Sequence, residues 1–230
     1  MSLNQTIVAL DQMNMEEIEI FLSLPQNNIQ TVKIGLELFL KHGSNLVLKI
    51  HNDYHKKIFL DLKLHDIPKT VERAIYSLKG LPVDFLTLHL SGGEEMLKAA
   101  LKEAKTSLPN CKILGVSFLT SLEEKDLTTL FGISNSEEAF LRLFKVADNS
   151  GIDGVICSPL EISLVKNNYP RLLAITPGIR FKDEIDSQKT QDQKRIATPK
   201  EALNLGADFI VIGRSLTQAE NLNERLKQLI

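Results

Sequence analysis

The sequence of 230 residues contains no tryptophan, only two cysteines and almost no excess of charge of either sign. Cys111 and Cys157 are too few for a disulfide framework, so we expect reduced, buried thiols and a cytoplasmic location. No apolar run approaches the roughly 18 residues of a transmembrane helix. The first residues lack the basic and apolar regions of a secretion signal. We therefore expect neither a membrane protein nor a secreted one.

The formal net charge of −2 argues against general binding of nucleic acids, although it leaves room for a local basic pocket. The chain also has no linker, no low-complexity tract and no break in composition. We therefore expect residues 1–230 to form a single domain.

Short apolar runs recur along the chain, and each is followed by a stretch with helical periodicity. Several runs are almost continuously hydrophobic, as parallel strands covered by helices are. The eight runs are Thr6–Leu10, Thr31–Ile34, Ile58–Leu64, Phe85–Leu90, Lys112–Phe118, Gly154–Cys157, Leu172–Thr176 and Phe209–Ile212.

The amphipathic stretches between these runs complete eight β/α units. This alternation predicts an α/β protein with a (β/α)8 TIM barrel, and a doubly wound open sheet is the main alternative because periodicity does not show closure. The predicted helices are Met15–Leu24, Leu36–Ile50, Pro68–Leu78, Glu94–Lys105, Glu137–Asn149, Leu160–Lys166, Pro199–Leu205 and Leu216–Leu229.

Two connections between these units stand out. Residues 121–136 form the longest connection and have room for a short extra helix. Residues 180–195 are rich in charge and poor in large apolar side chains, which is typical of an exposed loop that closes over a ligand.

Several charged side chains fall on strand faces that should point into the barrel. Because side chains alternate along a strand, the leucines of Ile58–Leu64 should face the helices, and Asp61 and Lys63 should face inward. The same alternation aims three more side chains at the carboxyl mouth of the barrel: Asp11, Lys33 and His89.

A single strand-end charge is usually a solvated rim residue, and a lone histidine is usually structural. Asp66, which precedes Ile67-Pro68, would on its own be interpreted as a helix N-cap. The convergence of five such side chains on one mouth favours a functional interpretation, since burying unpaired charges costs several kcal/mol or more. Alternating lysines and carboxylates offset one another and mark a functional site, which TIM barrels place at this mouth.

A phosphate site is predicted at the loops after the seventh and eighth strands. Thr176-Pro177-Gly178-Ile179-Arg180 follows the seventh strand, and Gly213-Arg214-Ser215 follows the eighth. Glycine N–H groups and arginine side chains bind phosphate oxygens well. Each loop alone could be an ordinary turn, but together they favour a phosphorylated small-molecule ligand.

The segment Asp61-Leu62-Lys63-Leu64-His65-Asp66 resembles the D-x-K-x-x-D signature of the orotidine 5'-phosphate decarboxylase family. That signature occurs in a wider group of barrel enzymes, so the other blocks make the resemblance more specific. Further segments match the bacterial enzymes in order: Ala9–Asp11, Lys33–Phe39, Leu119–Ser121, Thr176–Arg180, Asp192-Gln193 and Val211–Arg214.

The resemblance implies the conversion of orotidine 5'-monophosphate to uridine 5'-monophosphate and CO2, the last step of pyrimidine nucleotide synthesis. It implies no cofactor and no metal, and a homodimer in which Asp66 and Thr70 reach the neighbouring site. Lys63, Asp61, Asp66 and Lys33 would form the charged catalytic array, and Asp11 and Lys33 would contact the ribose. Thr120 would contact the pyrimidine, and Arg180, Gln193, Gly213 and Arg214 would hold the phosphate.

Two alternatives stay open at this point. A keto-sugar-phosphate decarboxylase or synthase on the same barrel would need a divalent metal, so a chelator would abolish its activity. A catalytically silent barrel would bind uridine monophosphate and leave orotidine monophosphate intact. The intact Lys63 between Asp61 and Asp66 argues against a pure binder.

Overall fold

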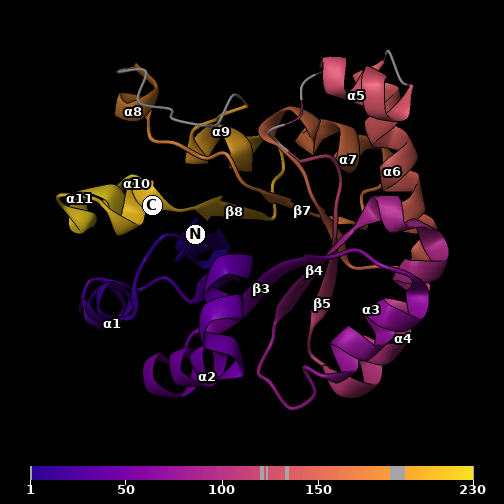
Figure 1. The fold of residues 1–230 in the computed structure, drawn as a ribbon. Coiled ribbons are helices and arrows are strands. Elements are labelled where there is room, and N and C mark those ends of the chain that lie inside the picture. Colours follow the sequence, from indigo (N-terminus) through magenta and orange to yellow (C-terminus); the bar gives the residue numbers. More distant parts are fainter. Residues whose placement is uncertain (1, 120–121, 123, 133–134, 187–194, 230) are drawn as a thin grey trace.

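The computed structural model describes residues 2–119, 122, 124–132, 135–186 and 195–229. Eight parallel strands form a closed barrel in the order of the sequence (Figure 1). The strands are β1 (Thr6–Ala9), β2 (Thr31–Gly35), β3 (Lys57–Leu64), β4 (Phe85–His89), β5 (Lys112–Val116), β6 (Gly154–Ile156), β7 (Leu173–Thr176) and β8 (Phe209–Ile212).

Closure decides between the two architectures that the sequence left open. The first strand pairs with the last, with Thr6 opposite Ile210 and Val8 opposite Ile212. An open doubly wound sheet has no such pairing, so the predicted (β/α)8 TIM barrel is confirmed.

Helices surround the barrel, as Figure 1 shows. None of the helices in the described part of the chain combines the length and the hydrophobicity of a membrane span. The α-helices are α1 (Met15–Ser23), α2 (Leu36–Tyr54), α3 (Pro68–Tyr76), α4 (Gly93–Ser107), α5 (Glu124–Phe131), α6 (Ser136–Ser150), α7 (Ile162–Asn168), α8 (Lys182–Asp186), α9 (Pro199–Asn204), α10 (Arg214–Thr217) and α11 (Leu222–Lys227).

Of three expectations about the helices and connections, one is confirmed, one is wrong and one is wrong in part. The extra helix expected in the long connection is present as α5. The single helix expected over Leu216–Leu229 is wrong, because α10 ends at Thr217 and Asn221 caps a new helix by accepting from the N–H of Glu224. Residues 180–195 are not an exposed loop throughout, since Phe181 is buried and α8 follows it.

The core has two parts. A large cluster lies between the strands and the helices, and it includes the leucine face of β3 that alternation predicted. A smaller cluster fills the barrel, where the rings of Phe59, Phe85 and Phe209 meet edge to face. The barrel is therefore packed with apolar side chains below its carboxyl mouth.

Aspartates join three pairs of neighbouring strands at the amino end of the barrel: β3 with β4, β5 with β6, and β7 with β8. Asp84, Asp153 and Asp208 each stand directly before a strand, and each accepts from a backbone N–H of the preceding strand at 2.7–2.8 Å. In TIM barrels this end serves stability, so chemistry is expected at the opposite end.

Candidate active site

Charged side chains from three neighbouring strands meet at the carboxyl mouth. The Lys33 ammonium lies 2.7 Å from Asp11 Oδ2 and 3.3 Å from Asp61 Oδ2. The Lys63 ammonium lies 2.7 Å from the same Asp61 oxygen. The structure thus brings together Asp11, Lys33, Asp61 and Lys63 in one alternating chain of charge.

The centre of this chain is buried. The side chains of Lys33 and Asp61 are only 10% and 11% exposed, so their charges depend on each other rather than on water. Burial alone would raise the pKa of Asp61, but Lys33 and Lys63 hold the pKa below its ordinary value. Burial would likewise lower the pKa of Lys33, and the attraction of Asp61 and Asp11 raises it instead. Both groups are therefore ionised at neutral pH.

Gly35 makes room for this arrangement. It follows Lys33 and Ile34 at the end of β2, and any Cβ at this position would collide with the Asp11 carboxylate. A side chain at this position would therefore push the Asp11 carboxylate away from its place beside Lys33.

Lys63 is less buried than Lys33, with 38% of its side chain exposed. Its backbone is left-handed, with φ of 50°, at a point where the register between β3 and β4 shifts. The backbone N–H of Lys63 donates to Thr87 Oγ1 at 2.9 Å. Thr87 in turn donates to Asp61 Oδ1 at 2.8 Å. Sequence reasoning did not select Thr87, although alternation places it on the inward face of β4.

Asp66 and Thr70 lie apart from this array on the exposed start of α3. Asp66 is not the helix N-cap that it would be on its own, because Ile67 occupies that position. The Asp66 carboxylate instead accepts from the N–H of Ile67 at 2.7 Å, and it forms no ion pair within the described residues. Ile67 beside it is 66% exposed.

His89 lies at the end of β4, half-buried, with its ring 5.3 Å from that of His65. Burial lowers the pKa of His89, and the nearby His65 and Lys63 lower it further. His89 is therefore neutral at neutral pH. Within the described residues, no three His, Cys, Asp or Glu side chains gather as metal ligands.

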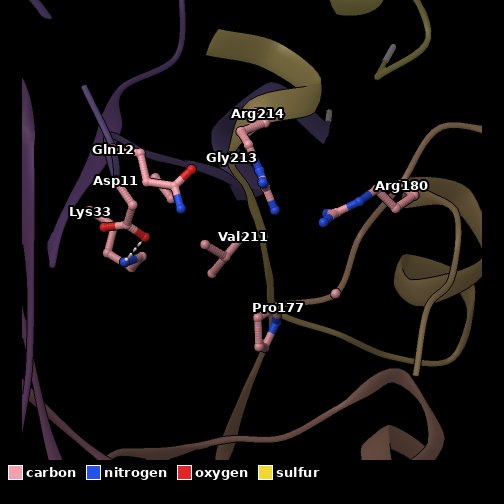
Figure 2. Close-up of a pocket in the computed structure, with 10 residues that line it drawn as sticks. Asp11, Gln12, Lys33, Pro177, Arg180, Val211, Gly213 and Arg214 are labelled. Atoms are coloured by element: carbon pink, nitrogen blue, oxygen red, sulfur yellow. Dashed lines mark hydrogen bonds and ion pairs between the residues drawn. The ribbon is translucent and has the colours of Figure 1, made fainter. Parts of the chain in front are cut away.

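A cavity of about 200 Å³ opens beside the charged array. Figure 2 shows the side chains of Arg180 and Arg214 reaching toward the same space from the ends of β7 and β8. Gly178 and Gly213 expose backbone at its wall, and Asp11 and Lys33 close its other side. Two guanidinium groups facing one space suit an anion such as phosphate.

Gln12 also lines this cavity, and sequence reasoning missed it. Its backbone is left-handed, with φ of 64°, and Figure 2 shows its amide group near Arg214. The signal available in the sequence was its position directly after Asp11 at the end of β1.

The residues on both sides of 187–194 are bonded to each other and to the segment after β6. Arg180 N–H donates to the Ala197 carbonyl oxygen at 3.0 Å, and Ala197 N–H donates to Gly178. Arg195 pairs at 2.7 Å with the buried Glu161. Two predicted site residues, Thr120 and Gln193, lie outside the described residues.

Comparisons with known proteins identify the family of this chain. A model of the orotidine 5'-phosphate decarboxylase / HUMPS family matches residues 4–229. The chain belongs to this family. A protein named orotidine 5'-phosphate decarboxylase from Staphylococcus saprophyticus is 44% identical, with 95% of this chain and 93% of that protein covered. One of the same name from Geobacillus sp. strain WCH70 is 42% identical over 96% of this chain and 95% of its own length.

Solved structures agree with the family assignment. The crystal structure of orotidine 5'-phosphate decarboxylase from Lactobacillus acidophilus superposes with a TM-score of 0.82 at 35% identity, covering 98% of this chain and 97% of that one. An uncharacterized conserved protein from Geobacillus kaustophilus gives a TM-score of 0.82 at 33% identity, with 97% of each chain covered. In this member of the family, the charged array and the arginine-lined cavity lie next to each other at the carboxyl mouth of the barrel, and Asp11 and Lys33 belong to both.

Proposed function

We propose that this chain is a carboxy-lyase that converts orotidine 5'-monophosphate to uridine 5'-monophosphate and CO2. This reaction is the final step of pyrimidine nucleotide biosynthesis, and we place it in the cytoplasm and in a single domain over residues 1–230. The observation that carries the proposal is the chain of charge from Asp11 through Lys33 and Asp61 to Lys63, beside a cavity that two arginines line. Close relatives of the chain carry the name of this decarboxylase.

The chemistry explains why such an array is useful. Loss of CO2 from C6 of the pyrimidine leaves an electron pair in the plane of the ring, where the ring π-system does not accept it. The protein must therefore stabilise this charge electrostatically and then supply a proton. The Lys63 ammonium can do both, because it can lie beside the developing carbanion and then protonate C6.

Asp61, Lys33 and Asp11 have supporting roles in this proposal. Asp61 lies 2.7 Å from the Lys63 ammonium and keeps it charged and oriented. Lys33 bridges Asp61 and Asp11, which fixes both carboxylates before the substrate enters. Asp11 and Lys33 also contact the ribose hydroxyls, since both line the cavity. No metal or cofactor takes part in the proposed steps.

The remaining contacts hold the ends of the nucleotide. Arg180, Gly213 and Arg214 bind the phosphate, together with Gln193, and Thr120 contacts the pyrimidine. Arg180, Gly213 and Arg214 line the same cavity as Lys33, which supports a ligand that spans from phosphate to ribose. Remote phosphate binding of this kind contributes to catalysis by positioning the reacting group.

We also propose a homodimer in which Asp66 and Thr70 complete the site of the neighbouring subunit. Both residues are exposed on one copy of the chain, next to the exposed Ile67. Leu36 and Leu40 on α2 and Tyr76 on α3 are exposed as well, between 52% and 75%. Exposed apolar side chains on α2 and α3, together with a carboxylate that forms no ion pair within the described residues, suit a partner subunit that buries those side chains and uses the carboxylate.

The test is the ultraviolet absorbance of orotidine 5'-monophosphate mixed with the purified protein, with and without a chelator. We expect the absorbance to change to that of uridine 5'-monophosphate at the same rate in both samples. In the same assay Lys63→Ala should abolish the absorbance change. The matched control, Lys98→Ala, removes an exposed lysine of α4 and should keep full activity. Activity that the chelator abolishes would support the metal-dependent keto-sugar-phosphate enzymes. Folded protein that binds uridine monophosphate without turnover would support a silent binding barrel.

A further inference from the structure

The backbone of β3 is irregular where the charged array is formed. Leu60 pairs with Leu86 and Leu64 pairs with Leu88, so residues 61–63 stand opposite a single residue of β4, Thr87. Bulges of this kind re-aim side chains next to active sites. The left-handed backbone of Lys63 is part of the bulge, and such a conformation persists only where its surroundings enforce it.

The Thr87 side chain makes hydrogen bonds where the regular pairing between β3 and β4 is interrupted. Its side chain is fully buried, so its hydroxyl must find partners within the protein. Thr87 Oγ1 accepts from the Lys63 N–H at 2.9 Å and donates to Asp61 Oδ1 at 2.8 Å. One hydroxyl therefore joins the backbone of Lys63 to the carboxylate of Asp61.

These two bonds decide how the Asp61 carboxylate is oriented. Oδ1 is held by the Thr87 hydroxyl, and Oδ2 faces both ammonium groups, Lys63 at 2.7 Å and Lys33 at 3.3 Å. Without the hydroxyl, rotation of the carboxylate about its Cβ–Cγ bond would no longer be fixed. The Lys63 backbone N–H would lose its hydrogen bond to Thr87, and the Lys63 ammonium would face a carboxylate whose orientation is no longer fixed.

We propose that Thr87 is a positioning residue for the decarboxylation, acting through Asp61 and Lys63. This role rests on the proposed function. Thr87 itself is not among the residues that line the cavity. Its contribution is to set the direction of the Lys63 ammonium relative to the substrate, and a displacement of about 1 Å at a reacting group can cost about 100-fold in rate.

Two substitutions separate this role from simple packing. Thr87→Val keeps the shape and removes the hydroxyl, whereas Thr87→Ser keeps the hydroxyl and removes the methyl group. A packing role predicts that serine is the more damaging change, and a positioning role predicts that valine is. If Thr87→Val fails to fold, Thr87→Ala and Thr87→Ser give the same comparison, because both lack the methyl group and only one has the hydroxyl.

The experiment measures kcat and KM for orotidine 5'-monophosphate, with thermal unfolding as the check on folding. We expect Thr87→Val to lower kcat by about 10- to 100-fold with KM changed by less than about 3-fold. We expect Thr87→Ser to retain kcat within about 3-fold, on the same argument. A kcat of Thr87→Val equal to that of the wild type, or lower activity in the serine variant than in the valine variant, would overturn the proposal.

The pH profile of kcat is a second readout that packing would not move. Among the described residues, Lys33 and Lys63 pair with Asp61 and His89 interacts with it, and the Thr87 hydroxyl is one of the contacts that lower the pKa of Asp61. Removing it raises that pKa, so the acid limb of kcat should move to higher pH in Thr87→Val and stay in place in Thr87→Ser. An unmoved limb in the valine variant contradicts the proposal. An inactive wild type would overturn the proposed function as well, whereas an active wild type with an unaffected valine variant overturns only the role of Thr87.

Discussion

Replacing Asp61 by asparagine tests whether the charged array stabilises the fold as well as serving the chemistry. The Asp61 carboxylate is the only partner that Lys33 and Lys63 share within the described residues. Lys33 is 10% exposed and would keep only its contact with the more exposed Asp11. Removing one member of a buried ion pair typically costs about 3–5 kcal/mol, because a buried charge is left without compensation.

We expect Asp61→Asn to fall at the lower end of that range, about 3 kcal/mol, since the Lys63 ammonium can turn to water. With a urea m-value of about 3 kcal/mol/M, the unfolding midpoint would fall by about 1 M. The matched control is Asp53→Asn, which removes a 53% exposed partner of Lys49 on α2. Such an exposed pair contributes less than about 0.5 kcal/mol, so its midpoint should move by less than about 0.2 M.

The difference between the wild type and Asp61→Asn should also depend on pH. The pKa of Asp61 is lower in the folded protein than the value of about 3.9 for an unfolded chain. Its stabilising contribution is therefore fully present above about pH 4 and is lost as the pH falls through the lower folded pKa. Urea unfolding at several pH values would show a constant difference near neutrality that closes in acid. Equal midpoints at neutral pH, or a difference that does not change in acid, would refute the reasoning.

Three further predictions concern activity. Lys63→Ala should abolish turnover while uridine monophosphate still binds, as calorimetry would show; retained turnover would remove Lys63 from its proposed role. Arg214→Ala should lower kcat/KM by about 100-fold with an unchanged unfolding midpoint, since hydrogen bonds to charged groups contribute about 1.5–3 kcal/mol each; an unchanged kcat/KM would refute the phosphate assignment. Inactive Asp66→Ala and Lys63→Ala chains should recover about a quarter of wild-type activity when refolded together, because each mixed dimer has one intact site; no recovery would count against a shared site.

The sequence predicted the parts of the site that follow from strand alternation. Lys33 on β2 and Asp61 on β3 face the same way because side chains alternate along regular strands. The sequence also predicted that Lys63 meets Asp61, although the bulge at residues 61–63 interrupts the regular alternation there. The leucines of β3 pack toward the helices, as alternation predicted. Strand alternation therefore predicts a cluster of charge at the carboxyl ends of the strands whether or not the sheet closes into a barrel.

Features that depend on contacts between distant residues were not predictable in this way. Strand alternation is regular, so it does not reveal the bulge that sets Thr87 against three residues of β3. The burial of Phe181 within a charged segment depends on Arg225, whose guanidinium stacks over the ring at 4.7 Å and also pairs with Asp183. Closure of the barrel likewise depends on the pairing of β1 with β8 across the whole chain.

The central claim is that this array removes CO2 from C6 of the substrate and replaces it with a proton. Nuclear magnetic resonance of orotidine 5'-monophosphate with the purified protein in D2O tests it directly. We predict one equivalent of CO2 and uridine 5'-monophosphate that carries deuterium at C6, because the proton comes from an exchangeable ammonium. Unchanged orotidine 5'-monophosphate in the presence of folded, nucleotide-binding protein would contradict the account.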